Sequence, residues 1–338
     1  FYMLTTYMKR ILLLLILILS FQNSHSQDNE LSKNDEKSIK KMIREFERNS
    51  IHKDSIDWKY FEKKVWESAA ISKDSAVITA LTLNGEKHSS YYDQTSKTYL
   101  SGQGKEDYNY KKIEPFKSEE NLGYINILSF IDSRKSLDET LKKGAEYITE
   151  NLENIKKRDA KKLKGWVIDL RRNNGGNMWP MLVSLTPFLE NEILGYFLIE
   201  DKWNEWSKQE NEIYNGSANQ TKKFIDAPLD YKLTNKNLKI AVLINGNTAS
   251  SGEGAAIALM SNPNVKFFGN STAGYTTSNS TITLKNNDIL ILTSGVMADY
   301  TKKEYWNGVE PNFKISGTDD LKNEILEWFS KNTAVNNG

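Results

Sequence analysis

Apolar residues near the start of the folded region recur at the three- and four-residue intervals of an amphipathic helix. One such run covers 39–46, and a second follows Asp57, a residue type that commonly caps a helix. A third helix is expected over 75–83, because the Asn84-Gly85 pair that follows is a typical helix stop. The pattern predicts a small N-terminal helical subdomain.

The pattern changes after residue 123, where apolar runs of strand length alternate with helical periodicity. The first of these helices begins at Ser136-x-x-Glu139, which has the form of a capping box. Two strand-turn-helix units in tandem predict a layered α/β domain. The expected strands cover 123–130, 166–170 and 238–244, and the expected helices start at 136, 178 and 249.

Four further segments complete the pattern. The segment 94–117 is mostly polar, which predicts a surface loop or short hairpin. The segment 202–230 is also mostly polar, and we expect it to be an insertion over one face of the domain. Two short β runs, 280–284 and 289–293, are joined by Asn286-Asn287. We expect a closing helix over 319–329, and domains at 27–115 and 116–338.

The N-terminal segment has the features of an export signal. Met8-Lys9-Arg10 precedes the apolar run Ile11 to Leu19. The segment then ends in small residues up to Ser26, as at a signal-peptide cleavage site. The run is about half the ~20 residues that a spanning helix needs, so we expect cleavage rather than a stable membrane span. Residues 1–26 are therefore predicted to be a signal peptide with an upstream extension, and retention as an anchor is the alternative.

Composition narrows the possible functions. The chain has 45 Lys and Arg against 44 Asp and Glu, and this balance argues against a nucleic-acid partner. It has no cysteine, which excludes disulfides, thiolate nucleophiles and zinc–thiolate sites. With three histidines, no set of metal ligands at transition-metal spacing is found, so we expect neither a metal nor another cofactor.

The most informative turn is Asn245-Gly246-Asn247-Thr248-Ala249-Ser250-Ser251, where a buried strand leads into a helix. Ser250 would lie at the helix N-terminus, where free N–H groups and the helix dipole stabilise the negative charge of a tetrahedral intermediate. The N–H of Ser251 is one candidate oxyanion donor. The alternative is that one of these hydroxyl residues only caps the helix.

A second turn, Asn173-Asn174-Gly175-Gly176, also leaves a buried strand. Its paired glycines allow a backbone N–H to turn outward toward a ligand, so Gly175 or Gly176 is a candidate for the second oxyanion donor. The composition is equally that of an ordinary turn. It lacks the Gly-Lys-Ser/Thr of a phosphate loop, and this argues against a nucleotide site.

A nucleophilic serine needs a proton acceptor, and histidine is the usual one. His25 lies within the predicted signal peptide, and His52 lies in a polar link between helices, where a solvated role is expected. His88 follows a helix stop on a loop that could overhang the α/β domain, so it is the better candidate, with a surface role as the alternative.

These segments together resemble the core of the tail-specific proteases, also called C-terminal-processing peptidases. The resemblance covers roughly 123–315 and depends on four motifs in the right order. They are Asp169-Leu170-Arg171 through Gly175-Gly176, Asn245-Gly246-x-Thr248-Ala249-Ser250-x-x-Glu253, Gly269-x-x-Thr272-x-Gly274, and Gly308-Val309-Glu310-Pro311.

The resemblance implies a crotonase-like fold and assigns roles to matching positions. Ser250 matches the nucleophile of the family. Ser251 and a glycine matching Gly175 or Gly176 correspond to its oxyanion hole.

Two departures from the family pattern bear on mechanism. The bacterial processing enzymes place a general-base lysine where this chain has Tyr275. The branch typified by the tricorn protease core uses an upstream histidine, and Gly85-Glu86-Lys87-His88-Ser89 resembles that segment. The same branch orients its histidine through a glutamate, for which Glu304 and Glu310 are candidates without clean alignment. The interval between His88 and Gly123 is also too short for a PDZ domain.

The resulting prediction is an exported serine peptidase, periplasmic or extracellular, that hydrolyses extended polypeptides through Ser250 and His88. The alternatives are a peptide-binding protein that has lost efficient proton transfer, motivated by Tyr275, and an exported esterase. The sequence does not decide the oligomeric state.

Overall fold

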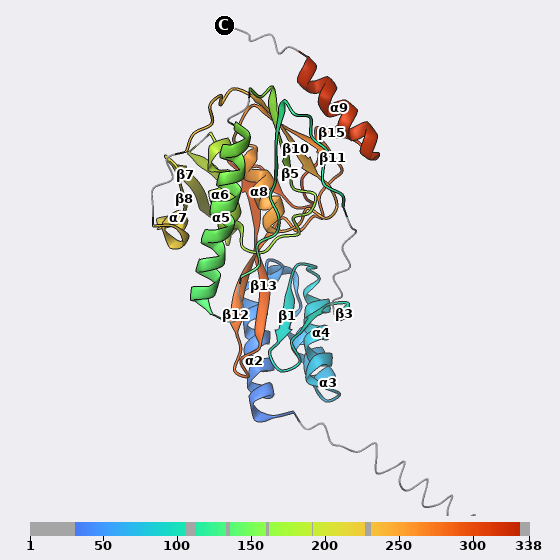
Figure 1. Ribbon diagram of the computed structural model, residues 1–338. Coiled ribbons are helices and arrows are strands. Elements are labelled where there is room, and N and C mark those ends of the chain that lie inside the picture. Colours follow the sequence, from blue (N-terminus) through green and yellow to red (C-terminus); the bar gives the residue numbers. More distant parts are fainter. Residues whose placement is uncertain are drawn as a thin grey trace, which may run out of the picture. The chain divides into compact units, whose positions relative to one another are not determined.

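The computed structural model describes residues 31–105, 113–132, 136–159, 162–190, 192–226 and 231–331 (Figure 1). They divide into two units, each described here by itself. The first comprises the described residues before 107 together with Thr281–Leu292, and the second comprises those of 107–280 and from Thr293 on. The predicted signal segment and His25 lie outside the described residues.

Three helices form the core of the first unit, as the periodicity predicted. They are α2 (Lys33–Asn49), α3 (Trp58–Ala69) and α4 (Lys73–Asn84), with a 3₁₀ turn η1 (Lys53–Ser55) after α2. The side chain of Asp57 caps α3, as expected, by accepting from the N–H of Tyr60. Gly85 ends α4 with a φ of 72°, a left-handed conformation that glycine adopts without steric cost.

Short antiparallel strands complete the first unit. β1 (Ser90–Asp93) pairs with β2 (Thr98–Ser101) and with the start of β13 (Ile289–Asp299), and β2 pairs with β3 (Gly104–Lys105). The buried carboxylate of Asp288 accepts from the Tyr91 hydroxyl at 2.5 Å and from Lys73 Nζ at 3.0 Å. These charge-assisted bonds hold the hairpin turn against the helical core.

The second unit is built on a five-stranded parallel sheet. Its order is β15-β11-β10-β5-β4, and every adjacent pair is parallel. Alternate residues face opposite sides, so Trp166 and Ile168 pack on one face and Val167 on the other. The strands are β4 (Leu122–Asn126), β5 (Gly165–Asp169), β10 (Lys239–Ile244), β11 (Val265–Gly269) and β15 (Phe313–Lys314).

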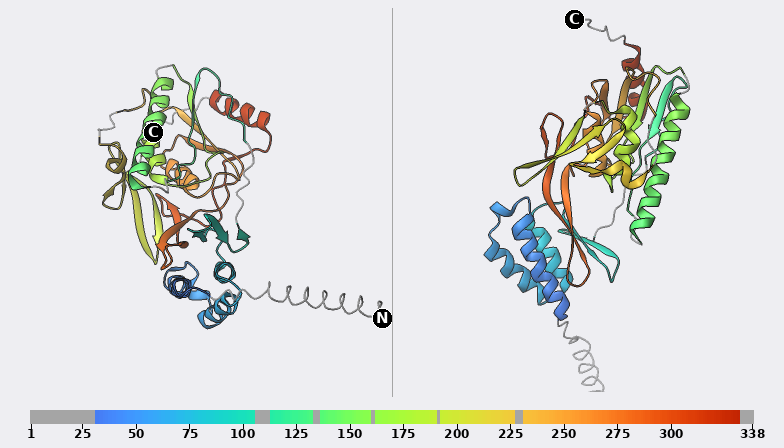
Figure 2. Two further views of the ribbon diagram at one scale, coloured as in Figure 1. Left: turned by 60° about the horizontal axis from the view of Figure 1, so that its bottom comes forward. Right: turned by 90° about the vertical axis from the view of Figure 1, so that its left-hand side faces the viewer.

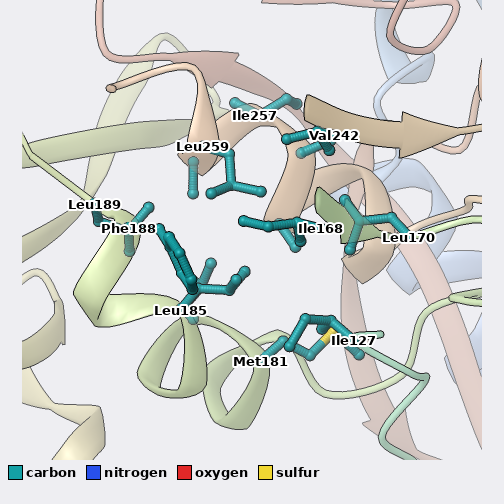
Figure 3. Packing of buried hydrophobic residues seen from close by; sticks show 14 of the residues in the cluster. Ile127, Ile168, Leu170, Met181, Leu185, Phe188, Leu189, Val242, Ile257 and Leu259 are labelled. Carbon is teal, nitrogen blue, oxygen red and sulfur yellow. The ribbon is translucent and has the colours of Figure 1, made fainter. Parts of the chain in front are cut away.

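Helices cover both faces of this sheet, which confirms the α/β prediction. Helices α5 (Leu137–Asp159), α6 (Met178–Leu185) and α8 (Ser251–Leu259), with the 3₁₀ turn η2 (Thr186–Phe188), pack on the first face. Figure 3 shows side chains of β5 and β10 meeting those of α6, η2 and α8 in this core. Helix α9 (Thr318–Ser330) packs on the other face through Leu321 and Ile325.

The described residues of the segment 202–226, expected to be part of a polar insertion, contain strands and a short helix. Strands β6 (Ile193–Ile199), β7 (Lys202–Gln209), β8 (Glu212–Asn215) and β9 (Ala218–Asn219) form an antiparallel meander that leads into α7 (Gln220–Phe224). Trp206 is fully buried in the core beside Phe197. Because this segment contributes few large apolar residues besides Trp203 and Trp206, its composition resembles that of a loop.

The meander joins the C-terminal part of β13, which pairs with β6 from Gly295 to Asp299 (Figure 2). The predicted hairpin is present but longer than expected: β12 (Thr277–Thr283) pairs with β13, and both strands contribute residues to the two units. A short strand β14 (Glu304–Tyr305) also pairs with β13. Among the described helices, none is long and apolar enough to cross a membrane. The predicted boundaries at 26 and 115 stay predictions.

Candidate functional site

The candidate residues of the second unit lie on loops that leave one edge of the parallel sheet. The C-terminal ends of β5, β10 and β11 are adjacent, and ligands of parallel sheets bind beyond such ends. Backbone bonds hold the loops together: Ala249 N–H donates to Asn173 O at 3.0 Å, and Ala273 N–H donates to Thr248 O at 2.9 Å. The turns singled out in the sequence therefore meet in space.

Ser250 has a strained backbone, with φ 52° and ψ −118°, directly before α8. A non-glycine residue in this conformation costs about 1–3 kcal/mol, and such strain occurs where a strand-to-helix turn presents a nucleophile. The residue is half-buried rather than enclosed in the core. The geometry thus places Ser250 at a strained corner of the kind that presents a hydroxyl for chemistry.

The buried carboxylate of Glu253 holds this turn in place. It accepts from the N–H groups of Ser250, Gly274 and Tyr275, each at 2.8 Å, and from the Thr272 hydroxyl at 2.5 Å. Burial raises the pKa of Glu253, and the four donors oppose this shift by stabilising the charged form. One side chain therefore ties the Ser250 turn to the loop after β11.

In the sequence, Glu253 is distinguished only as part of a motif. The available signal was its place three residues after Ser250, where a glutamate can accept from the N-cap N–H. The other three donors come from a loop about twenty residues away in sequence, so no local rule could have named them.

Gly175 packs directly against the candidate nucleophile. Its φ is 104°, and a Cβ added there would lie 2.9 Å from Ser250 Cβ and 3.1 Å from Ala249 O. Both the backbone conformation and the contact require glycine. The Gly175 N–H donates to Asn173 Oδ1 at 3.1 Å, so this group already has an acceptor.

Gly176 and Ser251 lie on the two sides of the same turn. The Ser251 hydroxyl donates to Gly176 O at 2.5 Å, and Gly176 has a φ of 113°. Ser251 is the first residue of α8, where backbone N–H groups lack partners within the helix. No acceptor is recorded within the described chain for either the Ser251 or the Gly176 N–H. Both groups could bind an oxyanion.

A buried ion pair supports the base of the glycine turn. The Asp169 carboxylate accepts from Arg171 Nη2 at 2.7 Å and from Arg171 Nε at 2.9 Å, and from the Tyr124 hydroxyl at 3.1 Å. Arg171 also donates to Glu114 O at 3.3 Å. Asp169 is fully buried, so the paired geometry is needed to offset its desolvation.

The closing motif packs against the loop after β11. Val309 N–H donates to Thr272 Oγ1 at 2.7 Å, and a Cβ at Gly308 would lie 2.6 Å from the same oxygen. The exposed carboxylate of Glu310 accepts from Ser271 Oγ at 2.7 Å, and Glu304 accepts from Trp306 Nε1 at 2.8 Å. Both candidate orienting glutamates thus have structural partners in the second unit.

His88 belongs to the first unit, in the turn between α4 and β1. The Glu86 carboxylate shapes this turn by accepting from the N–H groups of His88 at 2.7 Å and Ser89 at 3.1 Å. Burial, together with the smaller effect of the nearby Lys87 charge, lowers the pKa of His88 to about 4. The imidazole is therefore neutral at pH 7 and able to accept a proton.

The described residues contain no group of three or more His, Asp and Glu that could hold a metal ion. His52 precedes the turn η1, where its carbonyl accepts from the backbone and hydroxyl of Ser55.

Comparison with known proteins gives relatives along most of the chain. The nisin-resistance protein of Lactococcus lactis subsp. lactis is 27% identical over 304 residues, which cover 87% of this chain and 86% of that protein. A lipoprotein of Streptococcus agalactiae has a similar structure, with a TM-score of 0.68 at 22% identity over 88% of this chain and 97% of the other. The photosystem II D1 C-terminal processing protease has a TM-score of 0.56 at 12% identity, covering 85% and 94%.

Residues 121–315 match peptidase family S41. This segment includes the strained Ser250 turn, the glycine turn and the closing motif, and it covers more than half of the chain. The chain therefore belongs to peptidase family S41, the family of the tail-specific proteases, and is a serine-type peptidase.

Proposed function

We propose that this chain hydrolyses peptide bonds in extended polypeptides with Ser250 as nucleophile and His88 as general base. The observation that carries the proposal is the strained Ser250 turn, held by Glu253 and packed against Gly175. The layered sheet and helices of the second unit support, in addition, the expectation of a crotonase-like core.

In the proposed mechanism, Ser250 Oγ attacks the peptide carbonyl carbon while His88 accepts the hydroxyl proton. The N–H groups of Ser251 and a glycine of the turn stabilise the oxyanion. Gly176 is better supported than Gly175, because the Gly175 N–H is already donated to Asn173. His88 then returns the proton to the leaving amine, and water hydrolyses the acyl-enzyme by the same route.

The test compares Ser250→Ala with Ser271→Ala. Ser271 is a half-buried serine of the second unit whose hydroxyl donates to Glu310. We expect Ser250→Ala to abolish casein hydrolysis and fluorophosphonate labelling without lowering Tm, while Ser271→Ala keeps both. Labelling that survives in Ser250→Ala would refute the assigned nucleophile. His88→Asn tests the base separately, because it should slow labelling and leave binding of peptides intact.

Two observations favour the alternative of a peptide-binding protein with weak catalysis. Tyr275 occupies the position of the family's lysine, and the low pKa of His88 makes it a weak base. A wild-type protein that binds peptides but resists the fluorophosphonate would establish this alternative. An esterase would instead cleave ester substrates and leave the matched amides intact.

The N-terminal pattern and the relatives support a proposal on localisation and suggest one substrate to test. We propose export to the cell envelope, because residues 8–26 have the features of a signal peptide and the relatives include a lipoprotein. The peptide panel should include nisin, because of the 27% identity to a nisin-resistance protein.

A further inference from the structure

A groove of about 340 Å³ on the first unit is lined almost entirely by positive charge. Its walls are one face of α2 and the hairpin turn after β12. The cationic residues of α2 recur at three- and four-residue intervals, which places them on one side of the helix. They are Lys37, Lys40, Lys41, Arg44 and Arg48, with Lys285 on the hairpin turn.

The groove is held in a fixed shape. Asn286 N–H donates to Ser38 Oγ at 2.8 Å, and Lys41 Nζ donates to Thr283 O at 2.7 Å. On the opposite side of α2, Met42 and Phe46 are buried in the core of the unit. The charged face is therefore presented by a packed helix rather than by a free segment.

Little in the groove neutralises these charges. Glu45 is the one acidic residue that lines it, and its carboxylate accepts from Asn49 Nδ2 at 2.9 Å. No ion pair is recorded for the six cations within the described part of the chain, and all but Lys41 are exposed. The whole chain has a formal charge of only +1, so this is a local segregation of charge. Such clustering is repulsive unless an anionic partner binds.

We propose that this groove, named the α2 basic groove, binds the phosphates of an anionic phospholipid surface. Clusters of four to eight Lys and Arg bind anionic lipid by charge attraction, and Arg adds paired hydrogen bonds to phosphate. A membrane is favoured over an acidic protein, because only 13 residues separate the apolar run that ends at Leu19 from Lys33, the first residue of α2. An extended linker of that length spans about 45 Å at most, so α2 is held near the membrane until the predicted signal peptide is cleaved, and permanently if the run is retained as an anchor.

The experiment measures partitioning of the full chain onto vesicles of phosphatidylcholine alone and of phosphatidylcholine with phosphatidylglycerol, by co-sedimentation. The ratio of the two partition coefficients isolates the electrostatic contribution, because the apolar N-terminal run binds both kinds of vesicle. The variant K37Q/K40Q/R44Q/K285Q removes four charges from the groove. The control K142Q/K157Q/R158Q/K162Q removes the same four charges from exposed positions on or just after α5.

Each charge near an anionic bilayer strengthens binding by about fivefold, so the groove variant should lose more than about 100-fold in this ratio. The control variant should lose far less, and the wild-type ratio should fall as salt is raised. Equal partitioning of the wild type onto both vesicles would overturn the proposal. So would an equal loss in both variants, or displacement by polyglutamate at matched charge, which would indicate an acidic polypeptide partner.

Discussion

Replacing Gly175 by alanine tests how closely the glycine turn controls the candidate nucleophile. The new methyl group would lie 2.9 Å from Ser250 Cβ, which is closer than real Cβ contacts allow. Neither neighbour can move freely, because Asn173 bonds to both Gly175 N–H and Ala249 N–H. The substitution therefore moves the glycine turn relative to the Ser250 turn, and these two turns carry the candidate oxyanion donors.

The expected loss in the free energy of unfolding has two parts. An alanine at a φ of 104° costs about 1–3 kcal/mol in backbone strain. Relieving the contact with Ser250 adds about 1 kcal/mol in displaced backbone. We expect the free energy of unfolding to fall by about 2–4 kcal/mol. Displacement of reacting groups by a fraction of an ångström to 1 Å should lower kcat/KM by about 100-fold.

The assay combines thermal unfolding with kcat/KM on a fluorogenic peptide, using two matched glycines. Gly216→Ala creates a positive-φ alanine at 55° with no atom within 4 Å of its Cβ, so it costs about 1 kcal/mol without loss of activity. Gly246→Ala, in the loop that leads to Ser250, has no atom within 4 Å and should change neither quantity. Wild-type kcat/KM in Gly175→Ala, or an equal loss in Gly216→Ala, would refute the reasoning.

The remaining predictions concern the charged groups around the turn. Glu253→Gln places an amide where four donors meet. It should lower the free energy of unfolding in urea by about 2–4 kcal/mol and slow fluorophosphonate labelling. Unchanged labelling would show that the carboxylate does not position the turn. Asp169→Asn leaves the buried Arg171 without its counter-charge and should cost about 3–5 kcal/mol, whereas a loss below 1 kcal/mol would contradict the pairing. For His88, a pKa of about 4 places the acid limb of kcat/KM near pH 4, and Lys87→Ala should move that limb upward; a limb near 6.5 in both proteins would argue against His88 as the base. The unfolded chain binds the His88 proton below about pH 6.5 and the folded chain only near pH 4, so stability should fall as pH drops through this window in wild type, and less steeply in His88→Asn.

Local patterns in the sequence determined most of the secondary structure. Caps such as Asp57 and Ser136 and stops such as Gly85 act within a few residues, so they mark helix ends without knowledge of the fold. The order of strands and helices was sufficient to predict the α/β class. The meander at 202–219 was missed. Only one face of its sheet packs against the core, so the segment needs few apolar residues and its composition resembles that of a loop.

The sequence motifs alone also point to Ser250, Ser251, Gly175 and Gly176, and these residues lie together at one edge of the sheet. Their catalytic roles, and the pairing of Ser250 with His88, stay predictions. What only the tertiary structure decided is what surrounds them: the four donors to Glu253, the contact of Gly175 with Ser250 Cβ, and the α2 basic groove. Periodicity and capping depend on neighbours in sequence, whereas burial, close contact and clustered charge depend on segments that only the folded chain brings together.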